Sequence, residues 1–107
     1  MSVLLVDDEP GILRALERLF RRRGHEVRTT DSARGAIGLL DEFTPDVVIS
    51  DFRMDGMNGA ELLQVVAART PAARRILLSG FADTDQSGGA VFVRKPYDPQ
   101  ALLRLCE

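Results

Sequence analysis

The 107-residue chain has one cysteine, one histidine and no tryptophan. A single cysteine cannot close an internal disulfide, so nothing in the sequence points to an oxidising compartment. We therefore interpret Cys106 as a structural or incidental thiol. The lone histidine, His25, has no carboxylate or hydroxyl at catalytic spacing, which argues against a role in chemistry.

Long apolar runs are also missing, since no stretch approaches the roughly 18 residues that cross a bilayer. The N-terminus lacks the basic, apolar and small-residue order of a signal peptide, so we expect a cytoplasmic protein without membrane contact. The formal net charge is −2, and the concentrated positive run Arg21–Arg23 lies where a helix is expected to end. This balance argues against direct binding of nucleic acid by this domain.

The composition that remains is that of an ordinary globular protein, with 45% hydrophobic and 28% charged residues. A chain of this length can bury one core, so we expect residues 1–107 to form one domain. Short solid apolar runs alternate with segments of helical spacing, which is typical of parallel strands joined by helices. The expected strands are Val3–Val6, His25–Thr30, Val47–Ile49, Ile76–Leu78 and Ala90–Val93.

Helices are expected between these strands and after the last one. Pro10 opens the first helix and Gly24 ends it. Asp98 caps the final helix, whose apolar stripe is expected to be buried and consists of Leu102, Leu103 and Leu105. Right-handed crossovers then predict an α/β fold, a doubly wound sheet of five parallel strands.

Polar side chains stand directly after four of the five expected strands, namely Asp7, Asp8, Asp51, Ser79 and Lys95. Ligands of an open parallel sheet bind at the carboxyl ends of its strands, so we expect these side chains to share one crevice. Converging carboxylates repel one another unless a cation neutralises them, and oxygen ligands favour Mg²⁺, or Mn²⁺, over zinc.

This set of residues could act on a phosphoryl group. Lys95 adds a positive charge opposite the metal, and Asp51 supplies a carboxylate able to attack phosphorus and form an aspartyl phosphate. Ordinary loop acids and a solvated lysine would account for any one of these residues alone. They account poorly for the whole set at one sheet edge.

Four segments, in order, resemble the receiver domain of two-component response regulators, of which the chemotaxis response regulator is the single-domain type. They are Leu5–Pro10, Asp51–Met54 with Met57–Gly59, Leu78–Gly80 and Phe92–Pro96. The resemblance covers essentially the whole chain. It implies a flavodoxin-like sheet with strand order 2-1-3-4-5 and a phosphoprotein that regulates a partner rather than a separate enzyme.

The resemblance also assigns roles to the site residues. Asp51 would accept a phosphoryl group from a sensor histidine kinase or phosphotransfer protein. Mg²⁺ would be bound by Asp8 and Asp51 directly, by Asp7 mainly through water, and by the backbone carbonyl of Arg53. Lys95 would pair with the phosphate and precede a cis peptide bond to the next residue, a proline.

The same resemblance implies a switch formed by Ser79 and Phe92. Ser79 would follow the new phosphate and donate a hydrogen bond to it, drawing in its loop. Phe92 would swing into the space that this movement vacates. Together the two side chains would carry a local change of charge to a distant surface.

The chain departs from the family between Ser79 and Lys95, where a full fourth helix is usual. Here Gly80–Gly89 has no amphipathic stripe and ends in two glycines, so we expect that helix to be short or absent. Part of one sheet face would then lack its cover. We therefore expect a homodimer packed through Phe81, the fifth strand and the last helix.

Two other functions remain open at this point. A pseudo-receiver would keep the fold as a dimerisation or docking unit without switching. A small Mg²⁺-dependent phosphatase could use Asp51 as its nucleophile, but such enzymes have a second aspartate two positions later as proton donor. In this chain Arg53 occupies that position, which disfavours the enzyme.

Overall fold

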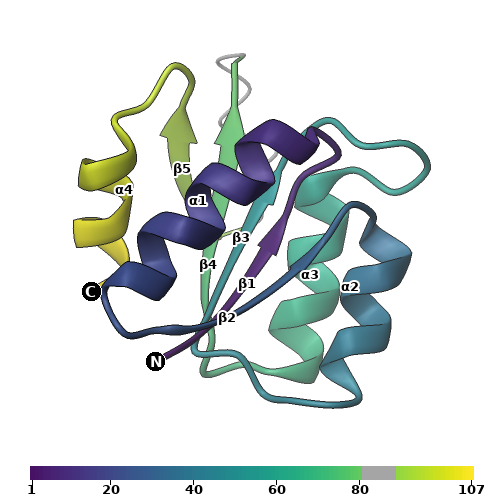
Figure 1. Cartoon of the computed structure of the whole chain (residues 1–107). Helices are drawn as coiled ribbons and strands as arrows, with labels where there is room; N and C mark the ends of the chain where they lie inside the picture. The colour runs from purple at the N-terminus through teal and green to yellow at the C-terminus, as the bar shows by residue number, and fades with distance from the viewer. Residues whose placement is uncertain (81–88) are drawn as a thin grey trace.

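The computed structural model describes residues 1–80 and 89–107, which form a parallel sheet between two helical layers (Figure 1). In chain order the elements are β1 (Ser2–Val6), α1 (Pro10–Arg22), β2 (Glu26–Thr30), α2 (Ala33–Leu40), β3 (Val47–Asp51), α3 (Gly59–Arg69), β4 (Arg74–Ser79), β5 (Val91–Arg94) and α4 (Pro99–Cys106). All neighbouring strands are parallel, in the order β2-β1-β3-β4-β5. The expected doubly wound, flavodoxin-like sheet is confirmed.

The central strands are solid apolar runs because both of their faces are covered. On β1, for example, Val3 and Leu5 belong to a core cluster with α1 and α4, whereas Leu4 and Val6 face α2 and α3. The same alternation holds on β3 and β4. Successive side chains of a strand point to opposite faces, so each strand contributes to two separate cores.

Local signals place the helix ends close to the expected positions. Pro10 begins α1, and Gly24 follows its end with a φ of 85°, a conformation that glycine adopts without strain. The side chain of Asn58 accepts a hydrogen bond from the Glu61 N–H, and the side chain of Glu61 accepts one from the Asn58 N–H. These two bonds form a capping box for α3.

One expectation about α4 is wrong. Leu105 was expected in the buried stripe, but it is 40% exposed, and Cys106 takes the buried position instead. The buried face of this eight-residue helix is therefore formed by Leu102, Leu103 and Cys106. A short helix at the edge of the sheet buries only a narrow stripe of its surface. That stripe is narrower than the spacing of the three leucines suggests.

The connection from β4 to β5 contains residues 81–88, which lie outside the described residues. The expectations about Phe81 and about a missing helix in this connection therefore concern a part of the chain that the structure does not describe. The structure describes four helices, of which the fourth is the short final one. Across residues 1–80 and 89–107, no helix is long and apolar enough to cross a membrane.

Candidate functional site

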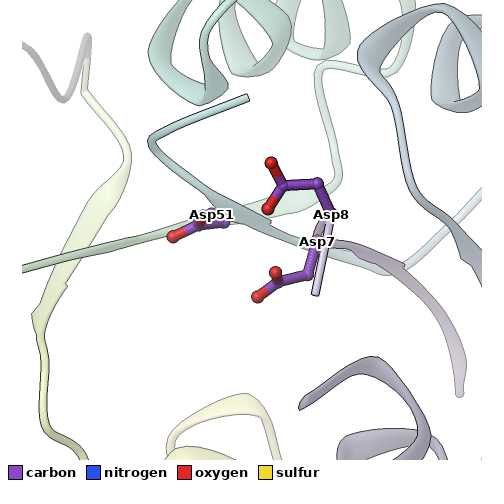
Figure 2. Close-up of side chains that lie close together, drawn as sticks. All are labelled: Asp7, Asp8 and Asp51. Carbon is purple, nitrogen blue, oxygen red and sulfur yellow. The ribbon is translucent and has the colours of Figure 1, made fainter. Parts of the chain in front are cut away.

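The carboxyl ends of β1 and β3 bring three aspartates together. Asp7 and Asp8 directly follow β1, and Asp51 is the last residue of the neighbouring β3. One carboxylate oxygen from each lies within 4.8 Å of the others. Figure 2 shows the three side chains reaching toward a common space beyond the strand ends. The crevice expected from the sequence is therefore an acidic cluster.

The three aspartates differ in burial. Asp7 is 3% exposed and Asp51 is 6% exposed, whereas Asp8 lies on the surface. The backbone N–H of Glu9 donates to Asp7 Oδ1 at 2.9 Å. The other oxygen, Asp7 Oδ2, is buried and is the one such side-chain oxygen or nitrogen without a hydrogen-bond partner among the residues that the structure describes.

This environment alters the acidity of Asp7. Burial raises the pKa of its carboxyl above the ordinary 3.8, and the charge of Asp51 raises it further. The hydrogen bond from the Glu9 N–H acts in the opposite direction, as does the positive charge of Lys95. Burial dominates, so an uncompensated negative charge is unfavourable at this position.

Lys95 forms an ion pair with the carboxylate of Asp51. Its Nζ lies 2.5 Å from Asp51 Oδ1, although the two residues stand 44 positions apart in the chain. The backbone N–H of Lys95 donates to the Ser79 carbonyl at 2.8 Å, which fixes the end of β5 against β4. The expected cis peptide bond between Lys95 and Pro96 is present.

Ser79 and Phe92 lie on the two strands beside this site. Ser79 ends β4, is 4% exposed and follows Leu78, which pairs in register with Asp51. Phe92 is half-buried on β5 and packs against the core cluster under α2 and α3. The structure thus places both side chains on the strands next to the acidic cluster, and their expected role as a switch stays a prediction.

A cavity of about 430 Å³ opens beside the acidic cluster. Asp8 lines one part of it, and Arg53, Asp55 and Asn58 from the loop after β3 line another. Exposed side chains of both charge signs therefore line this approach to the acidic cluster. The backbone carbonyl of Arg53 was predicted to bind the metal, whereas neither Asp55 nor Asn58 was predicted as a ligand.

Gly59 belongs to a segment that resembles the receiver family, but the sequence did not predict the close contact that it makes. It begins α3 close to Asp51, and a Cβ atom there would lie 2.1 Å from the backbone oxygen of Asp51. Its N–H donates to the Phe52 carbonyl at 2.8 Å. Glycine at this position therefore lets α3 approach Asp51 more closely than any other residue type would allow. In the sequence, only the asparagine–glycine pair before a helical run could have indicated this close approach.

The residues at this site fit a hard divalent cation. Three carboxylates converge, no nitrogen or sulfur ligand stands among them, and Asp7 Oδ2 is buried without a partner. Mg²⁺ binds oxygen ligands of this kind and keeps several of its waters. The acidic cluster is typical of a receiver metal site.

Comparison with known proteins identifies the family. Residues 3–107 match the family model of the response regulator receiver domain. The chain is 32% identical to the DNA-binding transcriptional regulator NtrC of Proteus hauseri over 99% of its length. It is 34% identical to the response regulator protein FleR of Pseudomonas aeruginosa over 97% of its length. It spans only 24% and 23% of those two proteins.

Solved structures agree with this match. A response regulator receiver domain protein from Clostridium thermocellum superposes with a TM-score of 0.88 at 31% identity, over 98% of this chain and 90% of that one. The chemotaxis response regulator CheY4 of Vibrio cholerae gives 0.87 at 28% identity, over 97% and 93%. A Burkholderia pseudomallei response regulator with a phosphorylated aspartic acid and a calcium ion shares the fold, with a TM-score of 0.88 at 22% identity over 99% of this chain and 66% of that one.

Proposed function

The chain belongs to the response regulator receiver family, and from this premise we propose that Asp51 accepts a phosphoryl group from the phosphohistidine of a sensor kinase or phosphotransfer protein. Members of this family are phosphoacceptor regulatory domains of two-component systems rather than enzymes. The observation that carries the proposal is the position of the Asp51 carboxylate, which lies inside the acidic cluster and 2.5 Å from Lys95 Nζ. We propose residues 1–107 as the extent of this domain.

In the proposed transfer, an Asp51 carboxylate oxygen forms a bond to phosphorus as the phosphorus–nitrogen bond of the phosphohistidine breaks. The bonding electron pair stays on the donor imidazole, which gains a proton from water. Lys95, displaced from the carboxylate, pairs with the phosphoryl oxygens and holds them in place. Asp51 needs no general base in this step, because it attacks as the carboxylate.

Asp7, Asp8, Asp51 and the backbone carbonyl of Arg53 would hold Mg²⁺, or Mn²⁺, beside the acceptor. When bound there, the cation would supply positive charge to offset that of the carboxylates and the phosphoryl oxygens. The raised pKa of Asp7 supports this assignment, since its charge lacks compensation in the protein alone. Asp7 also orients the start of α1 through the Glu9 N–H.

We propose that the phosphorylated state is transmitted by Ser79 and Phe92. The buried Ser79 lies at the end of β4, where its hydroxyl can turn toward a phosphate on the adjacent strand. Phe92 is half-buried on the neighbouring strand β5, where it packs against the core cluster under α2 and α3. A Ser79→Ala variant should accept phosphate but show a reduced change of chemical shift at Phe92 on phosphorylation.

The experiment that tests the acceptor is intact-protein mass spectrometry after incubation with Mg²⁺ and acetyl phosphate. The wild type should gain about 80 Da, and Asp51→Asn should gain nothing. Asp55→Asn is the matched control, because it removes an exposed carboxylate from the cavity beside the acidic cluster. This variant should still be labelled. An unlabelled wild type that still binds Mg²⁺ would overturn the proposal and favour a non-switching docking module.

We also propose that the chain forms a homodimer through the region around β5 and α4. Two of the large hydrophobic side chains exposed among the described residues lie here, Val91 at 49% on β5 and Leu105 at 40% on α4. Apolar surface of this kind is buried when a second copy covers it. Light scattering at high micromolar concentration should give the mass of two chains, and the mass of one would refute the dimer.

A further inference from the structure

A second cavity, of about 660 Å³, lies between the start of α2 and the loop that joins β3 to α3. It is larger than the cavity of about 430 Å³ beside the acidic cluster, and none of the three clustered aspartates lines it. In Figure 1 the loop lies above α2, at the end where the chain enters that helix. Cavities of this size bind small molecules, and the proposed phosphoryl transfer uses none of the residues that line this one.

Three apolar side chains line this α2–loop cavity. Ile37 from α2 and Met57 from the loop are half-buried and pack against the core cluster under α2 and α3. Ala33, which is 4% exposed, belongs to the same cluster. Part of the apolar surface of this helical layer therefore faces the cavity. An apolar group placed there would remove this surface from water, which favours binding.

The two walls of the α2–loop cavity carry polar groups of opposite kind. On the α2 side, Arg34 is exposed and has no hydrogen bond or ion pair among the residues that the structure describes. Ser32 beside it accepts a hydrogen bond from the Gly35 N–H at 3.0 Å, so its hydroxyl hydrogen can still be donated. On the loop side, Asp55 is exposed and is likewise unpaired within residues 1–80 and 89–107. One wall offers donors and a positive charge, and the other offers a carboxylate.

We propose that this cavity binds a small zwitterion with an apolar side chain, of the class of free apolar amino acids. The ligand's carboxylate accepts hydrogen bonds from Arg34 and the Ser32 hydroxyl, and its ammonium group pairs with Asp55. Its side chain contacts Ile37 and Met57. Because Arg34 and Asp55 line one cavity without pairing with each other, a ligand of single charge satisfies only one of them and binds more weakly.

The test is a titration of the protein with L-leucine and with L-phenylalanine, followed by NMR at the methyl groups of Ile37 and Met57. These signals should shift and saturate with at least one of the two amino acids, and the tighter ligand is carried forward. Its analogue without the ammonium group and its analogue without the carboxylate should each bind at least about tenfold more weakly. Glycine, which has both charges but no apolar side chain, should bind more weakly still.

Matched variants assign each ligand charge to its partner. Asp55→Asn should bind the amino acid and its analogue without the ammonium group with affinities within about twofold of each other. Arg34→Gln should likewise fail to distinguish the amino acid from its analogue without the carboxylate. Arg18→Gln and Glu42→Gln are the controls, because they remove exposed charges that do not line this cavity. Both controls should keep the tenfold preferences of the wild type.

Three outcomes would overturn this ligand site. The first is that neither amino acid, at millimolar concentration, shifts the methyl signals of Ile37 and Met57. The second is that the wild type binds a singly charged analogue as tightly as the amino acid, which assigns the cavity to a ligand of one charge. The third is that the same signals shift when the ligand-free protein is diluted, which assigns the cavity to a second copy of this chain. Labelling of Asp51 is measured separately and does not depend on any of these results.

Discussion

Charged groups at the two ends of the sheet are arranged in opposite ways. At the amino end, Arg23 and His25 contact the two carboxylate oxygens of Glu107 at 2.8 and 2.7 Å. At the carboxyl end, Asp7 and Asp51 are buried close together, and Asp7 Oδ2 has no partner among the described residues. Opposite charges pair at the amino end, whereas at the carboxyl end three carboxylates gather and one of them, Asp51, pairs with Lys95.

The charged groups at the amino end stabilise the fold, whereas those at the carboxyl end are arranged to bind a ligand. Pairing at the amino end joins the start of β2 to the end of α4, and Arg74 donates to the last carbonyls of that helix. Crowding at the carboxyl end opposes folding, because buried carboxylates lose their hydration without gaining enough hydrogen bonds. Neutralising a carboxylate should therefore raise stability at the carboxyl end and lower it at the amino end.

The largest effect on stability is expected at Gly59, where α3 lies closest to the backbone of Asp51. Gly59→Ala should lower the free energy of unfolding by more than about 2 kcal/mol, because its Cβ would collide with the Asp51 backbone oxygen. Gly38→Ala is the control, since a Cβ there meets nothing within 4 Å and should raise stability by up to about 1 kcal/mol. Urea unfolding measures the free energy of unfolding of both variants. Equal changes in the two would contradict a steric clash at Gly59.

Removal of the buried charge should have the opposite sign. Asp7→Asn should raise the free energy of unfolding of the metal-free protein at neutral pH by about 1–3 kcal/mol, because a neutral amide is less costly to bury. Added Mg²⁺ should reduce the difference in stability between Asp7→Asn and the wild type, because the wild type binds Mg²⁺ more tightly. Thermal melts in EDTA and in Mg²⁺ test this, and a destabilised variant in EDTA would show that Asp7 is satisfied after all.

The pH dependence of stability should separate the two ends as well. Because the pKa of Asp7 is raised in the folded state, folded protein binds more protons than unfolded protein at pH values above 3.8. This contribution favours folding at low pH and is lost as the pH rises from 3.8 through the raised value. Urea unfolding at successive pH values in EDTA should show this loss in the wild type and not in Asp7→Asn. Parallel curves would contradict it.

The smallest effect is expected at the amino end. Glu107→Gln should lower the free energy of unfolding by less than about 1 kcal/mol, because its partner Arg23 is 53% exposed and water screens the pair. High salt should reduce the difference between variant and wild type. Chemical unfolding at low and high salt measures this, and a loss larger than the gain of Asp7→Asn would reverse the comparison between the two ends.

Most of the fold could be predicted from the sequence because its signals are local. Solid apolar runs indicated β1, β3 and β4, whereas β2 was expected as a weaker strand with Val27 as its main apolar residue. The observed bounds differ by a few residues, since β5 begins at Val91 rather than Ala90. The prediction failed at Leu105, because helical spacing alone does not say how wide a stripe the sheet edge covers. The close approach at Gly59 could not be predicted either, since it depends on how α3 meets β3.

The sequence by itself determined the parallel sheet and the edge at which Asp7, Asp8, Asp51, Ser79 and Lys95 gather, because each follows an apolar strand. Only the tertiary structure decided that Asp7 is buried while Asp8 is exposed, and that Lys95 contacts Asp51. It also decided which arginines of α1 have partners. Strand ends are set by nearby residues, whereas burial and pairing depend on segments that are distant in the chain.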